Sequence, residues 1–266
     1  MTSPYAEVIG DPIAHSRSPA IYRFWLDELA IDGQYRATRV TRAEFKSYLA
    51  SRRADPDWRG CNVTMPLKLD ALLAADDPSD RATAAGAANL LALRDGQLIA
   101  ANTDVGAIQD LLAPQPRDSV TVLGNGGAAR AVLLALKLIG SGEVRLQARD
   151  MAEATSLCVE FGLGAGPRLF DTPVDSRGLV NATPIGMEGI ASHHIDFAPM
   201  PVDGWVLDLV SAPLPTPLVA QAAARGLATI DGLSVLVDQA ADSFALLFGQ
   251  KAPRERDINL FAMLRA

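Results

Sequence analysis

The sequence has little cysteine, little histidine and no excess of positive charge. Its 266 residues include two cysteines and three histidines, and 24 lysines and arginines face 31 aspartates and glutamates, so the net charge is -7. A chain with this balance lacks the basic surface that attracts the phosphates of DNA or RNA, so we expect no nucleic-acid partner. Cys61 and Cys158 lie in separate apolar segments, which argues against a disulfide framework.

The sequence also lacks a basic leader with an apolar core, and no uninterrupted apolar run is long enough to span a bilayer. We therefore expect a cytoplasmic protein with no membrane partner. With 49% hydrophobic residues, the chain has enough apolar material for one large core or two ordinary ones. We expect a monomer or a homodimer.

Histidine offers no metal site in this sequence. His193 and His194 are adjacent, and neighbouring residues point in different directions on regular structure. We interpret them as part of a solvated loop, and we predict no metal.

Apolar periodicity and turn residues predict strands that alternate with helices. The first hundred residues predict a β-α-β-α-β series, followed by a hairpin of residues 89–94 and 97–101 around Asp95 and Gly96. This order indicates a mostly parallel sheet with an antiparallel addition, and a second strand and helix series follows. We therefore predict an α/β fold with two domains. The predicted bounds are 1–103 for an N-terminal α/β domain, 104–231 for a Rossmann-type doubly wound domain, and 232–266 for a helical segment that returns to the first domain.

A glycine-rich turn opens the second series. The β-branched, apolar strand 119–123 runs into the turn 124–129, Gly-Asn-Gly-Gly-Ala-Ala, and then into a long helix. This is the G-x-G-x-x-A pattern of dinucleotide-binding folds in its required context. Gly124 permits the tight turn, Gly126 lets the backbone approach a pyrophosphate, and Ala129 lets the helix pack on the strand. We expect the phosphates to bind the amides at the helix start.

Lys68 is the candidate acid and base. It ends the stretch from Gly60, a short apolar strand that leads into a helix start, and Pro66 fits the first helical position. Lys68 then falls in the first turn, where the helix dipole disfavours a cation by about 0.3–1 kcal/mol. A lysine kept only for surface charge would be better placed elsewhere. The alternative interpretation is an ordinary exposed lysine near a helix start.

Further polar residues lie near the predicted strand ends of the first domain. Ser18, just before Pro19, fits a helix N-cap, whereas Ser16 has no such role and can point its hydroxyl into a cleft. Asp104 lies in a first helical turn, where the dipole favours a carboxylate; the alternative is an ordinary N-terminal helix residue. Four side chains can hydrogen-bond a hydroxylated acid without titrating. They are Ser16, Ser18, Thr64 and Asn89.

A dinucleotide domain combined with alcohol, amide and ammonium groups suggests hydride transfer. When nicotinamide reduces a ketone, the ketone oxygen gains negative charge and a positioned acid must give it a proton. Lys68 suits this role in both directions, and Asp104 would orient and hold the lysine. The predicted activity is that of an NAD(P)-dependent oxidoreductase.

Several ordered motifs are similar to those of one enzyme family over nearly the whole chain. They are Gly10-Asp11-Pro12-Ile13 with His15-Ser16-Arg17-Ser18-Pro19, Asn62-Val63-Thr64 with Pro66 and Lys68, Gly86-Ala87-Ala88-Asn89, Asn102-Thr103-Asp104, Gly124 to Ala129, Asn181-Ala182-Thr183-Pro184 with Gly186-Met187, and Gln239. The sequence resembles the shikimate dehydrogenases. The resemblance implies two α/β domains that flank a cleft, with shikimate against the first domain and NADP against the second.

The resemblance also implies a reaction and a set of site residues. The reaction is the reversible interconversion of 3-dehydroshikimate and shikimate, a small hydroxy acid. Lys68 and Asp104 would form the catalytic pair, and Gln239 would join the four substrate-binding residues. The cofactor-binding residues expected are Gly124, Asn125, Gly126, Gly127, Ala128, Arg149, Asp150, Thr183, Met187, Val210 and Gly232.

Departures from the family pattern leave the substrate and cofactor preferences open. Ser211 replaces a tyrosine that commonly lines the cleft. Arg149 can meet a 2′-phosphate, whereas Asp150 and Glu153 would repel it. Asp150 could instead accept a hydrogen bond from a free ribose hydroxyl, which favours NAD. We expect NADP, with NAD as the alternative.

Two other functions remain open from the sequence. The first is a dehydrogenase for quinate or another polyol acid that prefers NAD. The second is a non-catalytic, dinucleotide-binding regulator on the same fold. The presence of both Lys68 and Asp104 argues against the regulator.

Overall fold

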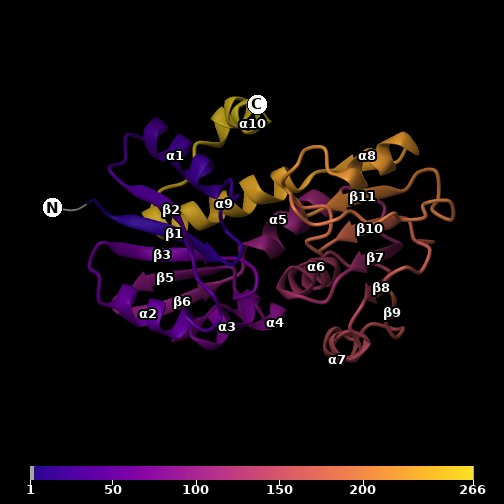
Figure 1. Ribbon diagram of the computed structural model, residues 1–266, viewed down its shortest axis with the longest axis horizontal. Helices are drawn as coiled ribbons and strands as arrows, with labels where there is room; N and C mark the ends of the chain where they lie inside the picture. Colours follow the sequence, from indigo (N-terminus) through magenta and orange to yellow (C-terminus); the bar gives the residue numbers. More distant parts are fainter. Residues whose placement is uncertain (1–2, 266) are drawn as a thin grey trace. The chain divides into compact units, whose positions relative to one another are not determined.

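The computed structural model describes residues 3–265, which form two compact units, each with its own six-stranded sheet (Figure 1). Unit 1 extends to Thr103 and resumes at Val237, and unit 2 comprises Asp104–Leu236. The second boundary lies inside helix α9 (Gly232–Phe248), so the end of the chain joins unit 1 from within this helix. The predicted α/β fold with two domains is confirmed.

Unit 1 contains a mixed sheet in the order β2-β1-β3-β5-β6-β4, most of which can be followed in Figure 1. Its first three strands are parallel to one another, and β5 and β6 pair antiparallel. This is the predicted parallel sheet with an antiparallel addition. The strands are β1 (Tyr5–Gly10), β2 (Gln34–Arg39), β3 (Trp58–Val63), β4 (Asp77–Pro78), β5 (Leu90–Arg94) and β6 (Gln97–Ala101).

The hairpin between β5 and β6 forms as predicted. Asp95 and Gly96 both have positive φ, as a two-residue hairpin turn requires. Before the hairpin, β4 pairs with β6 and helix α4 (Asp80–Ala85) follows it. Ser79 caps α4 by accepting a hydrogen bond from the amide of Ala82. The short, alanine-rich helix has no apolar periodicity that could have predicted it.

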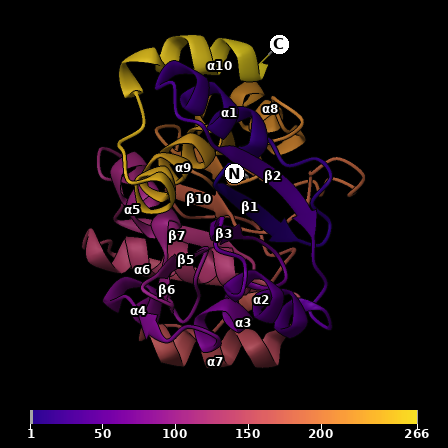
Figure 2. The ribbon, with the colours of Figure 1, turned by 90° about the vertical axis from the view of Figure 1, so that its left-hand side faces the viewer.

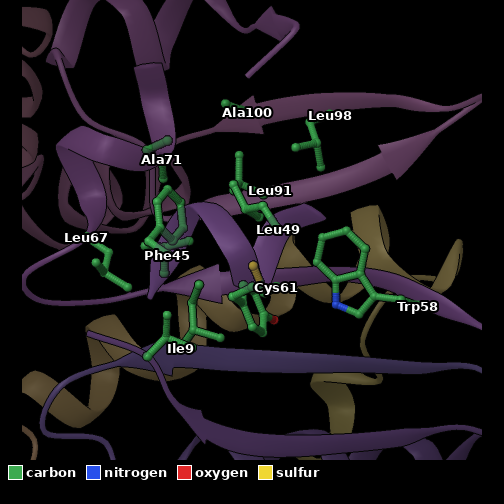
Figure 3. Packing of buried hydrophobic residues seen from close by; sticks show 14 of the residues in the cluster. Ile9, Phe45, Leu49, Trp58, Cys61, Leu67, Ala71, Leu91, Leu98 and Ala100 are labelled. Carbon is green, nitrogen blue, oxygen red and sulfur yellow. The ribbon is translucent and has the colours of Figure 1, made fainter. Parts of the chain in front are cut away.

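The core of unit 1 lies between its sheet and helices α2 (Phe45–Arg53) and α3 (Lys68–Leu73). Side chains of the two helices interleave with those of the strands in Figure 3. The residues labelled there are Ile9, Phe45, Leu49, Trp58, Cys61, Leu67, Ala71, Leu91, Leu98 and Ala100.

A second cluster joins helices from opposite ends of the chain. Tyr22 and Trp25 of α1 (Ser18–Glu28) contact the ring of Phe244 on α9. Helix α10 (Asp257–Arg265), preceded by the 3-10 turn η1 (254–256), lies beside α1 (Figure 2). The C-terminal segment therefore contributes to the packing of unit 1.

Unit 2 contains an entirely parallel sheet in the order β12-β11-β10-β7-β8-β9. Strands β8 and β9 follow β7 on one side of the sheet, and β10, β11 and β12 are then added on the other side of β7. This reversal is the topological switch point of a doubly wound sheet. The strands are β7 (Ser119–Leu123), β8 (Glu143–Ala148), β9 (Arg168–Leu169), β10 (Gly178–Asn181), β11 (Trp205–Asp208) and β12 (Ala228–Ile230).

Right-handed crossovers place the helices of unit 2 on both faces of its sheet. Helices α6 (Gly127–Leu138) and α7 (Met151–Phe161) follow strands β7 and β8, and α8 (Pro217–Ala224) follows β11. Helix α5 (Thr103–Leu112) leads into the unit. The long connection before β11 has no helix, and Phe197 is among the side chains of this loop that pack on the sheet.

No helix among residues 3–265 combines the length and the apolarity needed to cross a membrane. Cys61 and Cys158 are both buried and unpaired.

Glu7, on β1, is a fully buried carboxylate in unit 1. Arg52 donates to both of its oxygens at 2.7 and 3.2 Å, and Thr38 and Tyr48 each donate at 2.6 Å. Arg36 adds a further contact at 3.2 Å. Burial by itself raises the pKa of Glu7, but the hydrogen bonds from Arg52, Thr38 and Tyr48 outweigh it and hold the pKa below its usual value.

We predict that Glu7→Gln lowers the free energy of unfolding by about 3 kcal/mol, because it leaves the Arg52 guanidinium without its counterion. Urea unfolding at pH 7 measures this loss. Since folding lowers the pKa of Glu7, its contribution is present above the unfolded pKa of about 4.3 and is lost as pH falls through the folded value. The variant should therefore lose less stability in acid than the wild type. Glu28→Gln, which removes a surface pair with Arg256, is the control. Equal losses in both variants would contradict the prediction.

Candidate functional site

The loops that carry the predicted substrate residues leave one edge of the unit 1 sheet. The parallel strands β1 and β3 both end there, at Gly10 and Val63. Because β5 runs antiparallel to β3, and β6 antiparallel to β5, Asn89 just before β5 and Thr103 just after β6 lie at the same edge. Strand register thus gathers residues from four separate parts of the sequence.

Close backbone contacts hold the loops after β1 and β3 together. The amide of Thr64 donates to the carbonyl of Ile9 at 2.9 Å, and the amide of Asp11 donates to that of Met65 at 3.0 Å. A Cβ at Gly10 would lie 2.7 Å from the backbone carbonyl oxygen of Met65, so only glycine allows this approach. The loop with the two predicted serines therefore starts beside the loop that leads to Lys68.

Lys68 is the first residue of α3 and is half-buried. Its carbonyl accepts from the amide of Ala88 at 2.8 Å, which fixes the helix start beside the loop that ends at Asn89. The prediction that Pro66 is the first helical residue is wrong. Pro66 lies in the preceding turn, which the amide of Leu67 closes by donating to the carbonyl of Thr64. Lys68 still lies at the positive end of the helix dipole.

The predicted N-cap role of Ser18 is wrong, and Ser16 makes a local contact that was not expected. Arg17 is the N-cap residue of α1 and makes no side-chain cap, while Ser18 is buried as the first helical residue. Ser16, for which no local role was expected, accepts from the amide of Ser18 at 3.3 Å through its Oγ. Pro19 suits either of the first two helical positions, so it could not distinguish Ser18 as cap from Ser18 as first residue.

Asn62, on β3, is the centre of a buried polar network. Tyr22 and Tyr35 both donate to its Oδ1, at 2.9 and 2.8 Å, and their rings stack with centroids 3.7 Å apart. Its Nδ2 donates to Oγ of Ser243 at 2.9 Å. Burial raises the pKa of both phenols, so they remain donors at neutral pH. The only sequence signal for this network is a polar residue inside an apolar strand.

Thr103 connects this network to two of the predicted substrate residues. Its Oγ1 lies 3.0 Å from Oγ of Ser243 and accepts from Nδ2 of Asn89 at 2.9 Å. Its amide donates to Oδ1 of Asn89 at 2.8 Å. Oε1 of Gln239 accepts from Nδ2 of Asn89 and from the Thr103 hydroxyl, both at 3.3 Å. Asn89 and Gln239 therefore lie side by side, and the network sets the orientation of both amides.

The glycine turn of unit 2 has the geometry that the sequence predicted. Gly124 has φ +101°, and a Cβ there would lie 2.8 Å from Cγ2 of Thr183. Gly126 is the exposed N-cap residue of α6, and no atom of the described residues lies within 4 Å of the position a Cβ would take there. Ala129 is fully buried. The first amides of α6, from Gly127 and Ala128, are thus accessible to an anion.

The residues expected at the adenosine ribose follow β8. Arg149 is exposed. Asp150 is the N-cap residue of α7 and accepts from the amide of Glu153 at 3.0 Å. Oε2 of Glu153 accepts from Nδ2 of Asn125 at 3.0 Å. Both acidic residues therefore have a partner within the fold, and Asp150 has a structural role that the sequence analysis did not consider.

Buried side chains join the loops that follow β10 and β11. Nδ2 of Asn181 donates to Oδ1 of Asp208 at 2.8 Å, and Oδ1 of Asn181 accepts from the amide and the hydroxyl of Thr183 at 3.0 and 2.6 Å. A Cβ at Gly232 would lie 2.6 Å from the carbonyl oxygen of Val210. The predicted cofactor residues that follow the ends of β10, β11 and β12 are Thr183, Met187, Val210 and Gly232.

His193 and His194 are exposed and lie in the loop before β11, as predicted. Nδ1 of His194 lies 3.0 Å from Nε2 of Gln221. In the part of the chain that the structure describes, no group of three or more His, Cys, Asp and Glu residues could hold a metal ion.

Comparison with known proteins identifies the family. The family described as the shikimate dehydrogenase substrate binding domain matches residues 8–91. A shikimate dehydrogenase (NADP(+)) of Sphingopyxis alaskensis is 46% identical over 268 residues, which cover 99% of this chain and 98% of the relative. The chain belongs to the shikimate dehydrogenase family.

Solved structures show the same shikimate dehydrogenase fold. Shikimate 5-dehydrogenase from Thermus thermophilus, in complex with NADP(H) and shikimate, has a TM-score of 0.87 and 33% identity, with 98% of this chain and 99% of that chain covered. Quinate dehydrogenase from Corynebacterium glutamicum, in complex with NAD, has a TM-score of 0.85 and 28% identity at 98% and 99% coverage.

The Asn62 network yields a stability prediction. Tyr22→Phe and Tyr35→Phe each remove one of the two phenol donors to Oδ1 of Asn62, and each should lower the free energy of unfolding by about 1 kcal/mol. The double variant should lose more than the sum, because the buried oxygen then has neither phenol donor. Urea unfolding of the four proteins in the cycle measures this. Strictly additive losses would show that the two hydroxyls act independently.

Proposed function

We propose that the protein catalyses the reversible, NADP-dependent reduction of 3-dehydroshikimate to shikimate. The observation that carries this proposal is the 46% identity to a shikimate dehydrogenase (NADP(+)) along the whole of both chains. The presence of Lys68 and Asp104, and of the Asn89 and Gln239 amides in one network, supports it.

We assign substrate binding to the edge of unit 1 where Ser16, Ser18, Thr64, Asn89 and Gln239 are gathered. These side chains are neutral at all ordinary pH values, so they can recognise hydroxyls and a carboxylate through directed hydrogen bonds. Because Oε1 of Gln239 accepts within the network, we assign its Nε2 as the donor toward a substrate oxygen. Asn62 and Thr103 serve this site as positioning residues, since their contacts orient the two amides.

The residues of unit 2 fit a dinucleotide. The open approach at Gly126 and the accessible start of α6 suit a pyrophosphate, with Gly124, Asn125, Gly127 and Ala128 completing the turn. NADP, when bound, supplies the hydride that the ketone carbon accepts. Thr183, Met187, Val210 and Gly232 are assigned to the nicotinamide half of the cofactor, because they follow β10, β11 and β12.

Arg149 is assigned to the 2′-phosphate, for which a guanidinium is the suited partner. Asp150 already accepts the amide that begins α7, so its carboxylate is engaged in a cap and competes less for a ribose hydroxyl. This supports NADP over NAD.

Lys68 is assigned as the general acid and base, and Asp104 as the carboxylate that orients it. The lysine holds the proton that the ketone oxygen takes up on reduction, and it accepts that proton when the alcohol is oxidised.

Assays of shikimate and of quinate, each with NADP and with NAD, test the proposed function. We expect the largest kcat/KM for shikimate with NADP. Absorbance at 340 nm measures the turnover. A quinate dehydrogenase that prefers NAD is the second candidate, favoured by the NAD-bound structural relative and by Glu153 near Arg149. A larger kcat/KM for quinate with NAD would establish that candidate instead. Cofactor binding without turnover of either acid would point to a non-catalytic regulator.

We predict that Lys68→Ala lowers kcat by about 10²–10⁴-fold, the usual contribution of a positioned proton donor, while substrate binding is mostly kept. Steady-state kinetics with shikimate and NADP give both parameters. Lys46→Ala, which changes an exposed lysine on α2 of the same unit, is the matched control and should behave as wild type. An unchanged kcat in Lys68→Ala would remove the lysine from its assigned role.

A further inference from the structure

Asp208 is a fully buried carboxylate at the carboxyl end of β11. Its Oδ1 accepts from Nδ2 of Asn181 at 2.8 Å and from the amide of Val210 at 3.1 Å, and its Oδ2 accepts from Oγ1 of Thr216 at 2.6 Å. All three donors are neutral. Within residues 3–265, no lysine, arginine or histidine forms an ion pair with Asp208.

This arrangement is unfavourable for stability by itself. Moving a carboxylate out of water is expensive unless a cation compensates it, and neutral donors offset only part of the penalty. The pKa of Asp208 reflects this balance, because burial raises it above the usual value in spite of the three hydrogen bonds. An asparagine could make most of the same contacts without a charge. The two contacts at Oδ1 therefore need no charge, and only the Thr216 hydroxyl requires a second acceptor oxygen.

The position of Asp208 suggests what its charge acts on. Asn181 and Asp208 are register partners at the ends of β10 and β11, on the far side of the switch point from β8. A dinucleotide with its pyrophosphate on α6 and its adenosine beyond β8 extends its other half over β10 and β11. Thr183 links the two regions, because it donates to Asn181 and lies against Gly124.

We propose that Asp208 is an electrostatic positioning residue for the nicotinamide half of the cofactor, and that its buried charge favours the oxidised ring over the reduced one. NADPH, when bound, would supply a hydride to the ketone carbon and would become positively charged at its nicotinamide, while Lys68 would give its proton to the ketone oxygen. A fixed anion at the end of β11 would stabilise that positive charge. Asn181 and Thr216 hold the carboxylate in place. The inference rests on the proposed function, since it requires NADP as the cofactor.

Asp208→Asn tests the charge separately from the hydrogen bonds. The amide oxygen can still accept from Asn181 and Val210, so the variant should unfold at the same or a higher urea concentration. We expect the ratio of the Kd for NADP⁺ to the Kd for NADPH to rise by about fivefold or more, the size that two unit charges roughly 10–15 Å apart produce in a partly shielded interior. The 2′-phosphate and pyrophosphate are common to both forms and cancel in this ratio.

Two further variants separate the charge from its surroundings. Asp203→Asn removes an exposed carboxylate of the same unit that pairs with Arg177, and the ratio should not change. If Asp208→Asn does not fold, Asp208→Ser provides a smaller charge-free side chain for the same measurement.

The outcomes are distinguishable by fluorescence titration of the purified protein with each form of the cofactor. If the wild type binds neither form, the proposed function itself fails. If the wild type binds both and a charge-free variant weakens them equally, or leaves both unchanged, Asp208 has only a structural role and the present inference is overturned.

Discussion

The site in each unit depends on a close backbone approach at the carboxyl end of a strand, which glycine alone permits. In unit 1 a Cβ at Gly10 would meet Thr64 at 2.5 Å, and in unit 2 a Cβ at Gly124 would meet Thr183 at 2.8 Å. Each glycine ends or follows one strand, and each threonine belongs to the loop after a neighbouring parallel strand. Because each of these residues is a glycine, two loops can lie close together, and polar groups are gathered at one edge of the sheet.

The two units bury polarity in three different ways. Glu7 is an anion paired with a guanidinium, so its charge is compensated within the core of unit 1. Asn62 is neutral and is satisfied by two phenols and a hydroxyl, which fixes its amide and, through Thr103, those of Asn89 and Gln239. Asp208 combines burial and charge with neutral donors only. The first two arrangements stabilise the fold of unit 1. We explain the third by the positive charge that the nicotinamide would gain during the reaction.

Local signals in the sequence predicted most elements of the fold. The strand 119–123 has the bounds that its apolar, β-branched residues indicate, and the hairpin at Asp95 and Gly96 follows from turn chemistry alone. Details of helix starts were less predictable, because the role of Ser18 depends on whether the helix begins at that residue or one residue later. The network around Asn62 could not be predicted, since it joins residues up to 181 positions apart and depends on strand order and on the return of α9.

The position of Lys68 at a helix start was more predictable than the cofactor preference, and the contacts after β8 show why. The motif around Lys68 places a cation at a helix start, which is a local property. Preference for the 2′-phosphate depends instead on what Asp150, Glu153 and Asn125 do to one another. Asp150 is engaged as the cap of α7, and the amide of Asn125 holds Glu153 in place without neutralising its charge. Arg149 must therefore attract the 2′-phosphate beside two carboxylates that the fold holds in place but does not neutralise, and no local spacing in the sequence sets that balance.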